Sequence, residues 1–300
     1  MVNLGHTNIN TIRLALQRNQ LDIDQNARVG VQFYEDFQEK MDRLEVEKIG
    51  EIVSKAVKKY FRDAEVSIMG SYRRGSARCG DVDILITHPK VSLTKFERKP
   101  LFSCIIISSI CTQFVTFVPK GALDDLVERL RHDGYISHHL TKVDPVQREI
   151  FHQRRGNFDD LLMNASKKAE SYMGVFISPS MPRKHRRIDI KFYPYREKAF
   201  ASLYFTGNGW FNRAMRWYAK SKKKMTLNDK SLYPIDTANR MKAKSEQDIF
   251  DLLGLVYKRP HERDSFNALV PKQEGLDEER LEIGIDHSDF QAESKHVWVD

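Results

Sequence analysis

Residues 81–87 (Asp-Val-Asp-Ile-Leu-Ile-Thr) carry two acidic residues at alternate positions of an otherwise apolar run. The run predicts a β-strand that ends before Pro89. Because strand side chains alternate between two faces, Asp81 and Asp83 are expected on the same face. Two carboxylates held this close repel each other unless a cation neutralises them, and Mg²⁺ is the natural partner of oxygen ligands. An Asp-x-Asp pair alone is a weak signal, because on most surface strands it is simply solvated.

The segment just upstream of this strand, Gly70-Ser71-Tyr72-Arg73-Arg74-Gly75, follows a short strand predicted over residues 65–70. Glycines bracket a hydroxyl group and two guanidinium groups, so backbone N–H groups, the Ser71 hydroxyl and an arginine can converge on phosphate oxygens. Nucleotidyl transfer requires such a phosphate cradle close to a metal-binding carboxylate pair. The two segments together therefore predict a nucleotidyl-transfer site.

A third acid, Asp189, lies in another strand-like pattern, residues 186–193. If that strand neighbours the first, Asp189 completes the metal site and can accept a proton from an attacking 3′-hydroxyl. The basic residues around it, Arg186, Arg187 and Lys191, are equally compatible with an ordinary surface strand. The place of this strand in the sheet therefore decides the role of Asp189.

The composition is that of a folded globular protein with a basic surface. The chain has 300 residues, of which 41% are hydrophobic and 30% charged, and its net charge is +8. Such a composition excludes a disordered chain, and the positive charge suits a polyanion such as nucleic acid. The three cysteines form no CxxC pair, so neither a structural zinc site nor a disulfide framework is expected. The first residues contain no apolar signal-peptide core.

Hydrophobic periodicity predicts helices on both sides of the strands. Residues 8–62 are expected to be helical, and from Val31 to Tyr60 apolar residues recur near a 3.6-residue period, with Val46 off the apolar face. The residues assigned to that face are Phe33, Phe37, Met41, Leu44, Ile49, Ile52, Val53, Ala56 and Val57. The other expected elements are helices over 121–132, 197–206 and 209–222, and a strand over 173–177.

Four blocks of the sequence occur in the order that is characteristic of a known protein family. They are GSYRRGSARCGDVDILITHP (70–89), HRRIDIKFYPY (185–195), LYFTGNGWFNRAMR (203–216) and SEQDIFDLLGLVYKRPHERD (245–264). In these blocks the chain resembles the family X DNA polymerases, over about residues 5–264. The tyrosine of SYRRG, the cysteine before GDVD and the pattern FNRxMR are closer to the lambda-like members than to the beta-like members.

The resemblance implies an α+β fold. Its centre is a nucleotidyltransferase palm, a mixed sheet with helices, flanked by a helical DNA-binding subdomain and a C-terminal nucleotide-selecting subdomain. The implied organisation is a partial fingers-like helical subdomain over 1–62, a palm over 63–195 with an anomalous insertion at 91–120, a nucleotide-selecting subdomain over 196–264, and a polar tail over 265–300 whose weak periodicity is compatible with disorder.

The resemblance also implies roles for individual residues. The residues implied to be catalytic and to hold the metal are Asp81, Asp83 and Asp189. Those implied to contact the incoming nucleotide are Arg28, Gly70, Ser71, Arg74, Gly80, Tyr204, Phe205, Gly207 and Asn212. Tyr204 and Phe205 would pack under the sugar, and the backbone through Gly207 would exclude a 2′-hydroxyl. Asn212 would reach the minor-groove edge of the base, where acceptors are common to all correct pairs, and Arg216 would contact the template strand.

The implied function is template-directed DNA synthesis, in which dNTPs are added to a primer 3′-hydroxyl to fill short gaps in base excision repair and end joining. Two Mg²⁺ ions, with Mn²⁺ able to substitute, are the implied cofactors, and the implied partners are gapped or primer–template DNA, a dNTP and unidentified repair proteins, but no membrane. The nucleus is the expected compartment, with the mitochondrion as the alternative. Two other functions stay open: a template-independent nucleotidyltransferase and an inactive, truncated polymerase remnant.

Two departures from the family pattern bear on these expectations. The resemblance begins too late for the N-terminal lyase and BRCT domains and for the helix-hairpin-helix that grips the primer, so we expect no lyase activity and weak, strongly salt-dependent binding of gapped DNA. Residues 143–168 differ from the family loop, and residues 265–300 extend past its usual C-terminus.

Residues 91–120 form the third departure, because an apolar run from Leu101 to Val118 interrupts a polar region. The run is close to the minimum length of a membrane span but contains several polar residues, and a buried strand pair is an alternative. Deleting 91–120 restores a family-like strand, short loop and helix. We therefore hypothesise a translated, unspliced intron, whose initial Val-Ser can be encoded by a donor-like GTNAGY. Sequencing the transcript tests this, since messages that all encode the segment would refute it.

Overall fold

The computed structural model describes residues 8–88, 122–141, 170–181, 184–237 and 239–272. The chain divides into two compact units, residues 1–270 and 271–300, and only residues 271 and 272 of the second are described. The predictions for 91–120 and 143–168, and for the tail beyond residue 272, lie outside the described residues. Within the described part of the chain, no helix is long and apolar enough to cross a membrane.

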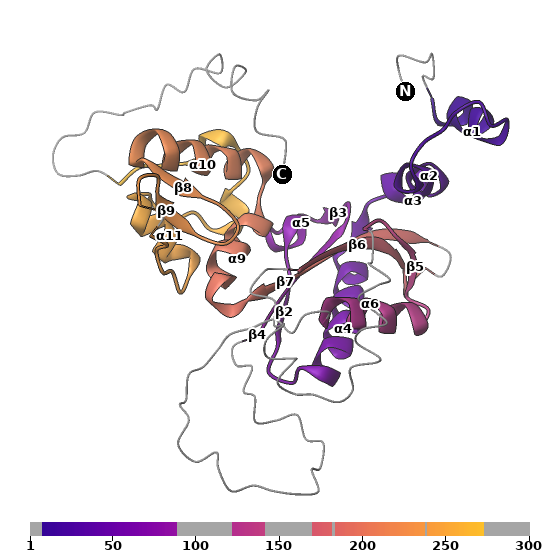
Figure 1. The fold of residues 1–300 in the computed structure, drawn as a ribbon, viewed down its shortest axis with the longest axis horizontal. Helices are drawn as coiled ribbons and strands as arrows, with labels where there is room; N and C mark the ends of the chain where they lie inside the picture. The colour runs from indigo at the N-terminus through magenta and orange to yellow at the C-terminus, as the bar shows by residue number, and fades with distance from the viewer. Residues whose placement is uncertain (1–7, 89–121, 142–169, 182–183, 238, 273–300) are drawn as a thin grey trace, which may run out of the picture. The chain divides into compact units, whose positions relative to one another are not determined.

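A five-stranded mixed sheet, in the order β2-β4-β7-β6-β5, carries the acidic residues (Figure 1). Its strands are β2 (Glu65–Ile68), β4 (Val82–His88), β7 (His185–Pro194), β6 (Glu170–Ile177) and β5 (Ile136–His139). β4 and β7 run parallel, whereas all other neighbours in this sheet are antiparallel. The predicted strands are thus confirmed, and the α+β fold class is correct.

Two helices, α4 (Arg43–Tyr60) and α6 (Ala122–His132), pack side by side on one face of this sheet (Figure 1). The side chains of Ile84 and Ile190 point into the hydrophobic core between these helices and the sheet. Because strand side chains alternate, Asp83 and Asp189 project from the opposite face, where the helix α9 (Lys198–Thr206) contacts β4 and β7. The acidic side chains therefore lie away from the main core of the sheet.

The predicted helical region before the sheet is divided into separate short elements. They are α1 (Ile9–Gln17), α2 (Gln25–Gln32), α3 (Tyr34–Gln38), the strand β1 (Met41–Asp42), which pairs with β3 (Arg78–Cys79), and then α4. Asn8, Asp24 and Asp42 cap α1, α2 and α4, each by accepting a backbone N–H with its side chain.

The assignment of Val46 to the polar side of α4 was wrong. Val46 is fully buried, whereas Leu44, which was assigned to the apolar face, is 58% exposed. Asp42 caps the helix and starts it at Arg43, so the helical phase is set there and places Val46 on the buried side with Ile49. The earlier apolar residues belong to other elements and could not define that phase.

One basic residue of β7 is buried rather than on the surface. The Arg186 guanidinium is 2% exposed and pairs with Glu45 of α4 at 2.8 Å between Nε and Oε1. The guanidinium also donates to the carbonyl oxygens of Asp36, which lies in α3, and of Glu39, which directly follows α3. This cluster joins α3 and α4 to the sheet, so Arg186 has a structural role in the fold.

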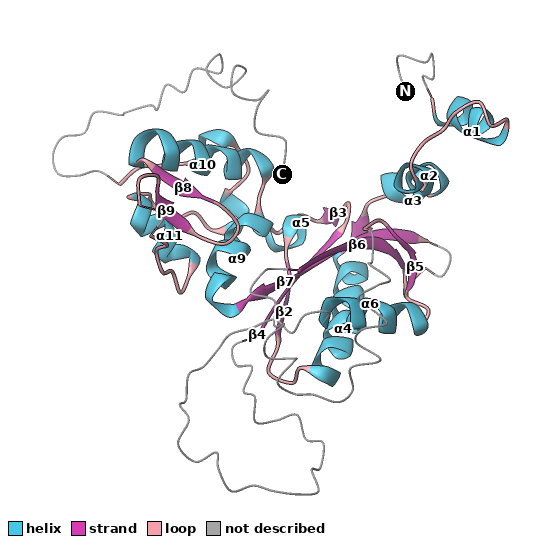
Figure 2. Cartoon of the chain, in the orientation of Figure 1, coloured by secondary structure: helices cyan, strands magenta, loops and turns pink. Residues whose placement is uncertain are grey.

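The C-terminal part of the first unit has its own core. Its elements are α9, α10 (Gly209–Lys223), β8 (Met225–Leu227), β9 (Leu232–Pro234) and α11 (Glu246–Leu253), with 3₁₀ turns at Tyr195–Glu197, Pro260–Glu262 and Phe266–Ala268. Helices predominate here around the small β8–β9 hairpin (Figure 2). Phe211 is fully buried among them. The helices predicted at 197–206 and 209–222 are confirmed.

Candidate active site

The parallel pairing of β4 with β7 brings the acidic residues together. Asp83 and Asp189 are register partners in the two adjacent strands, and Asp81 lies two residues before Asp83. Asp83 and Asp189 therefore come from two adjacent strands and from one face of the sheet, and Asp81 lies just before β4. The predicted neighbourhood of Asp189 with the Asp81–Asp83 pair is confirmed.

Burial and mutual repulsion both act on these carboxylates. Burial, together with the neighbouring charges of Asp81 and Asp189, raises the pKa of Asp83 to about 7. Burial also raises the pKa of Asp189, although the adjacent Lys191 ammonium opposes that effect. A site that disfavours its own negative charge in this way is suited to binding a cation.

Two basic side chains of β7 currently balance part of this charge. Arg187 Nη2 lies 2.7 Å from Asp81 Oδ2, and Lys191 Nζ lies 2.9 Å from Asp189 Oδ1. Lys191 also donates a hydrogen bond of 2.6 Å to Ser171 of β6. Asp81 and Asp189 are thus each paired with a cation of the chain itself.

The residue types fit a magnesium site, but the carboxylates do not converge on one point as they stand. Among the described residues, no three acidic, histidine or cysteine side chains are close enough together to hold a metal ion. Asp81 is directed toward Arg187, and Asp189 toward Lys191. Binding of a divalent cation would therefore require Asp81 to rotate away from an exposed partner, which is a small change.

The turn before β4 lies directly against Asp83. Gly70 begins the short helix α5 (Gly70–Arg73) with φ +56°, and Met69 N donates to the Asp83 carbonyl oxygen at 2.8 Å. A Cβ atom at Gly70 would lie only 1.9 Å from Asp83 Oδ2. Only glycine allows both this backbone conformation and this close approach. Ser71 follows it in α5, and Gly80 immediately precedes Asp81.

We expect Gly70→Ala to destabilise the protein by more than about 2 kcal/mol, because the new methyl group displaces the Asp83 carboxylate as well as straining the backbone. Gly75→Ala is the matched control, since Gly75 also has positive φ (+84°) but nothing within 4 Å of a Cβ position. The control should cost about 1 kcal/mol. Urea denaturation measures both, and equal losses would show that contact with Asp83 is unimportant.

The two arginines that follow Ser71 reach toward the C-terminal helices. Arg74 Nη1 donates to the Thr206 carbonyl oxygen at 2.6 Å, and Arg73 bonds the Thr206 hydroxyl. Arg73 also forms a bidentate pair with Glu246 at 2.7 and 2.8 Å, and Glu246 pairs in turn with Arg263. The predicted phosphate cradle is therefore tied to α9 and α11.

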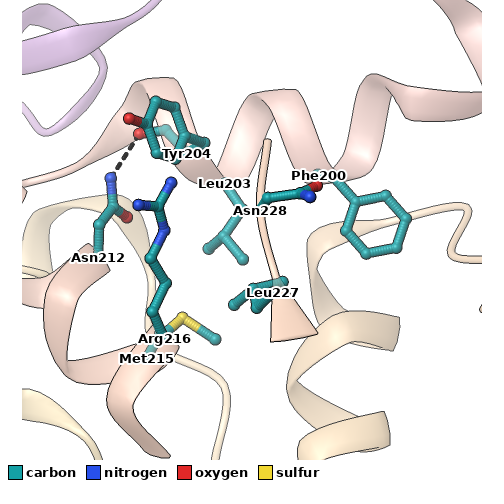
Figure 3. Close-up of a pocket in the computed structure, with 8 residues that line it drawn as sticks. All are labelled: Phe200, Leu203, Tyr204, Asn212, Met215, Arg216, Leu227 and Asn228. Carbon is teal, nitrogen blue, oxygen red and sulfur yellow. Dashed lines mark hydrogen bonds between the residues drawn. The ribbon is translucent and has the colours of Figure 1, made fainter. Parts of the chain in front are cut away.

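A pocket lies between α9 and α10 beside Tyr204 (Figure 3). Asn212 donates from Nδ2 to the Tyr204 carbonyl oxygen at 2.7 Å, and the Arg216 guanidinium carbon lies 4.7 Å from the centroid of the Tyr204 ring. The same pocket is lined by Phe200, Leu203, Met215, Leu227 and Asn228. Two of the predicted nucleotide- and template-contacting residues, Asn212 and Arg216, thus both contact a third, Tyr204.

Phe205 and Gly207, which follow Tyr204 in the sequence, lie against residues of β7 and of the turn before β4. Phe205 packs against Tyr193 of β7, and Lys191 Nζ lies 5.4 Å from its ring centroid. Gly207 has φ +67°, and a Cβ atom there would lie 3.1 Å from Arg74 Nη1. The side chain of Phe205 thus faces the sheet rather than the pocket, while Gly207 leaves room for Arg74.

Comparison with known proteins identifies the family. The family described as DNA polymerase beta palm matches residues 40–195, and the family described as DNA polymerase beta thumb matches residues 201–264. The palm match alone covers more than half of the chain. The chain belongs to the DNA polymerase beta family, family X. The predicted resemblance is confirmed, and the acidic site lies in the palm, whereas Tyr204, Asn212 and Arg216 lie in the thumb.

Several curated proteins of known name are similar to the chain. It is 31% identical to DNA polymerase lambda of Rattus norvegicus over 247 residues, which cover 79% of the chain and 35% of that protein. It is 30% identical to DNA nucleotidylexotransferase of Monodelphis domestica over 272 residues, or 87% of the chain and 48% of that protein. DNA polymerase lambda of Arabidopsis thaliana is 26% identical, with 82% of the chain and 40% of that protein covered. The chain thus spans less than half the length of these relatives.

The start of the palm match includes α4, which the sequence placed in the fingers-like subdomain. In the structure, α4 packs in the same core as the sheet. The subdomain boundary at residue 62 stays a prediction. Arg28, which was assigned to the triphosphate, lies in α2, where its guanidinium bonds Asp22 and the Ile23 carbonyl oxygen. Neither of these contacts involves a residue of the acidic site.

Sequence reasoning missed the basic and acidic partners of the site. Arg187 and Lys191 were treated only as possible surface residues, and the pairing of Arg73 with Glu246 was not foreseen. A usable signal existed for Lys191, because it lies two residues after Asp189 and so shares its face. No local signal pointed from Arg73 to Glu246, which lies 173 residues later.

Proposed function

We propose that the protein is a template-directed DNA polymerase that adds a dNTP to a primer 3′-hydroxyl and fills short gaps during DNA repair. The observation that carries this proposal is the register pairing of Asp83 with Asp189 in the palm, with Asp81 two residues away. Family membership supports nucleotidyl transfer on DNA, and polymerases of this family depend on metal ions.

In the proposed reaction, the primer 3′-oxygen attacks the α-phosphorus of the dNTP and pyrophosphate leaves. Asp189 accepts the proton of the 3′-hydroxyl, a role that suits a carboxylate whose pKa burial has raised. Ser71 and the backbone N–H groups of α5 bind the leaving phosphates, and Arg74 orients them from its position at Thr206.

Asp81, Asp83 and Asp189 would hold two Mg²⁺ ions, which supply stabilisation of the charge on the attacking and leaving oxygens. The donor set fits, since it consists only of carboxylate oxygens beside a phosphate-binding turn. Arg187 and Lys191 keep Asp81 and Asp189 neutralised before the substrates arrive.

The polar side chains around Tyr204 would select the nucleotide. Asn212 and Arg216 present an amide and a guanidinium beside Tyr204, and such donors reach the minor-groove acceptors that all correct base pairs share. Selection by the shape of the pair, rather than by base identity, is what a template-directed enzyme needs. The backbone at Gly207 would meet the sugar of a bound nucleotide.

Primer extension tests this function. The wild-type protein with Mg²⁺ should extend a primer opposite each of the four template bases with the complementary dNTP only. Asp189→Asn should lower the extension rate by about 10³-fold or more, because the amide neither accepts the proton nor binds the cation well. Asp236→Asn, an exposed position, is the matched control and should extend normally. An Asp189→Asn protein with wild-type activity would contradict the proposal.

A second candidate is template-independent nucleotide addition. It is favoured by the similarity to DNA nucleotidylexotransferases of Monodelphis domestica and Gallus gallus, each 30% identical to the chain. Incubation of a single-stranded primer with one dNTP separates the two functions. Untemplated tailing, without preference for the complementary dNTP on a primed template, would favour the transferase. A wild-type protein inactive in both assays would instead favour an inactive remnant.

A further inference from the structure

A cavity lies where the palm turn meets the thumb, and it shares no lining residue with the pocket beside Tyr204. Its volume is about 390 Å³, which falls within the range of about 300–1,000 Å³ that is usual for small-molecule sites. Its walls come from α5, α9 and the two ends of α11, and these helices lie close together (Figure 1). The function proposed above does not use this cavity.

The wall of the cavity carries a positive charge. Glu246, the acidic residue of the wall, pairs with both Arg73 and Arg263, so these three side chains together keep one positive charge. Lys244, directly before the N-cap of α11, adds a second. Lys198, the third basic residue of the wall, is already paired with a carboxylate. A cavity of this charge favours an anionic ligand.

Arg73 has donors left for such a ligand. Its side chain is 29% exposed, and its guanidinium group has five N–H donors. Bonds to Thr206 and Glu246 use three of them, and the described residues accept no further hydrogen bond from this group. The two remaining donors suit a phosphate or carboxylate group, because a guanidinium binds such oxygens in a planar, bidentate manner.

The opposite part of the wall is less polar. Ala199 of α9 is buried, and Tyr257 packs partly buried against the thumb core. Tyr257 lies close enough to Arg73 to interact with its charge. A ligand that joins a phosphate group to a flat ring would therefore find donors and an aromatic side chain within one cavity.

We propose that this cavity is a second nucleotide site, which binds a free nucleoside monophosphate away from the acidic residues. Arg73 and Lys244 hold the phosphate group, and the base packs against Tyr257. The volume exceeds what an inorganic phosphate ion alone would fill, so the ring accounts for the rest of the space.

The edge of the cavity favours a small anion over a nucleic-acid strand. Two residues of the wall donate hydrogen bonds to carboxylates of α11: Ser245 to Asp248 at 2.7 Å, and Gln247 to Asp251 at 2.9 Å. These carboxylates would repel the successive phosphates of an extended strand that crossed the cavity. A compact monophosphate can bind between Arg73 and Lys244 without crossing α11.

Occupation of the cavity would act on the phosphate-binding turn. Arg73 bonds the Thr206 hydroxyl, and the adjacent Arg74 bonds the Thr206 carbonyl oxygen at 2.6 Å. A phosphate that draws Arg73 away from Thr206 would loosen this connection, so a bound nucleoside monophosphate raises the KM for the dNTP. This effect on KM rests on the polymerase function proposed above, whereas the binding itself does not.

Titration calorimetry of the full chain with dAMP in EDTA tests the binding. Lys244→Gln should weaken it by about 5-fold or more, because one charged donor to the phosphate is lost. Lys242→Gln is the matched control, since Lys242 is exposed in the same segment but does not line the cavity, and it should bind as wild type. Thermal unfolding without ligand checks that each variant is folded. Equal affinity of wild type and Lys244→Gln would overturn the inference.

Other ligands test the chemistry of the site. Deoxyadenosine should not bind measurably, and inorganic phosphate should bind more weakly than dAMP. Equal affinity of dAMP with either compound would overturn the assignment to a nucleotide. If Lys244→Gln weakens binding of single-stranded oligothymidylate as strongly as it weakens binding of dAMP, the surface belongs to DNA and the inference is wrong.

Primer extension at increasing dAMP tests the effect on KM. The KM for the dNTP should rise in wild type and in Lys242→Gln, and the rise should require higher dAMP in Lys244→Gln. A rise at the same dAMP concentration in all three proteins would place the inhibition at the acidic site and overturn the coupling. Lysine-dependent dAMP binding by a wild-type protein that extends no primer would refute the polymerase function alone.

Discussion

Asp83→Asn is expected to stabilise the metal-free protein at pH 8 by about 4 kcal/mol while abolishing nucleotide addition. The native fold raises the pKa of Asp83 from its ordinary value of 3.8 to about 7, chiefly by burial and then by the charges of Asp81 and Asp189. A difference of this size corresponds to about 4 kcal/mol between the ionised and protonated forms. Asparagine fills the same space without the charge, so the cost disappears.

The pH dependence gives the sign of this effect. Because the folded-state pKa is above the unfolded-state value, the folded protein binds the proton more tightly, and ionisation of Asp83 disfavours folding. The penalty is absent below about pH 4, grows between about pH 4 and pH 7, and is complete above pH 7. The advantage of Asp83→Asn over wild type should therefore be small at pH 4 and largest at pH 8.

Urea denaturation in the presence of EDTA at several pH values measures this difference. The difference between variant and wild type isolates Asp83 from the other groups that titrate over the same range. Glu51→Gln, on an exposed position of α4, is the control and should show no such trend. Excess Mg²⁺ should reduce the advantage of the variant, because only wild type retains the carboxylate. A pH-independent difference would show that Asp83 is not destabilised by its surroundings.

The local patterns predicted the strands and the acidic pair well. The alternation of residues 81–87 fixes which side chains share a face, and this holds wherever the strand lies in the sheet. The position of Asp189 required one further fact, that β7 neighbours β4, and no local pattern reports the partner of a strand. The match to ordered family blocks supplied that fact, and the structure confirmed it.

The contacts between distant segments were the part that the sequence could not reveal. Arg73 was identified within the predicted phosphate cradle, but its bidentate bond to Glu246 depends on how α5 and α11 pack together. The burial of Val46 could have been predicted, since Asp42 followed by Glu45 is a helix-start pattern that sets the phase of α4. Apolar residues recur near the same period across several short helices, so the periodicity alone did not show where α4 begins.

Glu246→Gln is expected to destabilise the protein by about 3–5 kcal/mol, since it removes the carboxylate that pairs with two arginines in a largely buried cluster. Arg263 is 0% exposed and pairs with Glu246 at 3.0 and 3.2 Å, while Arg73 pairs with it at 2.7 and 2.8 Å. Burial alone would raise the pKa of Glu246, yet hydrogen bonds from both arginines hold it below its ordinary value. The carboxylate is therefore ionised in the native state, and its loss removes the anion that pairs with the buried Arg263 charge.

The exposed pair of Arg13 and Glu35 offers a matched control. It is also bidentate, at 2.7 and 2.6 Å, but Glu35 is 61% exposed, so Glu35→Gln should cost less than about 1 kcal/mol. Urea denaturation compares the two variants. Because Arg73 is adjacent to Arg74 and both reach Thr206, Glu246→Gln should also raise the KM for the dNTP under conditions where the variant is folded. If both substitutions lower the free energy of unfolding equally, the buried cluster does not stabilise the packing of the palm turn against the thumb.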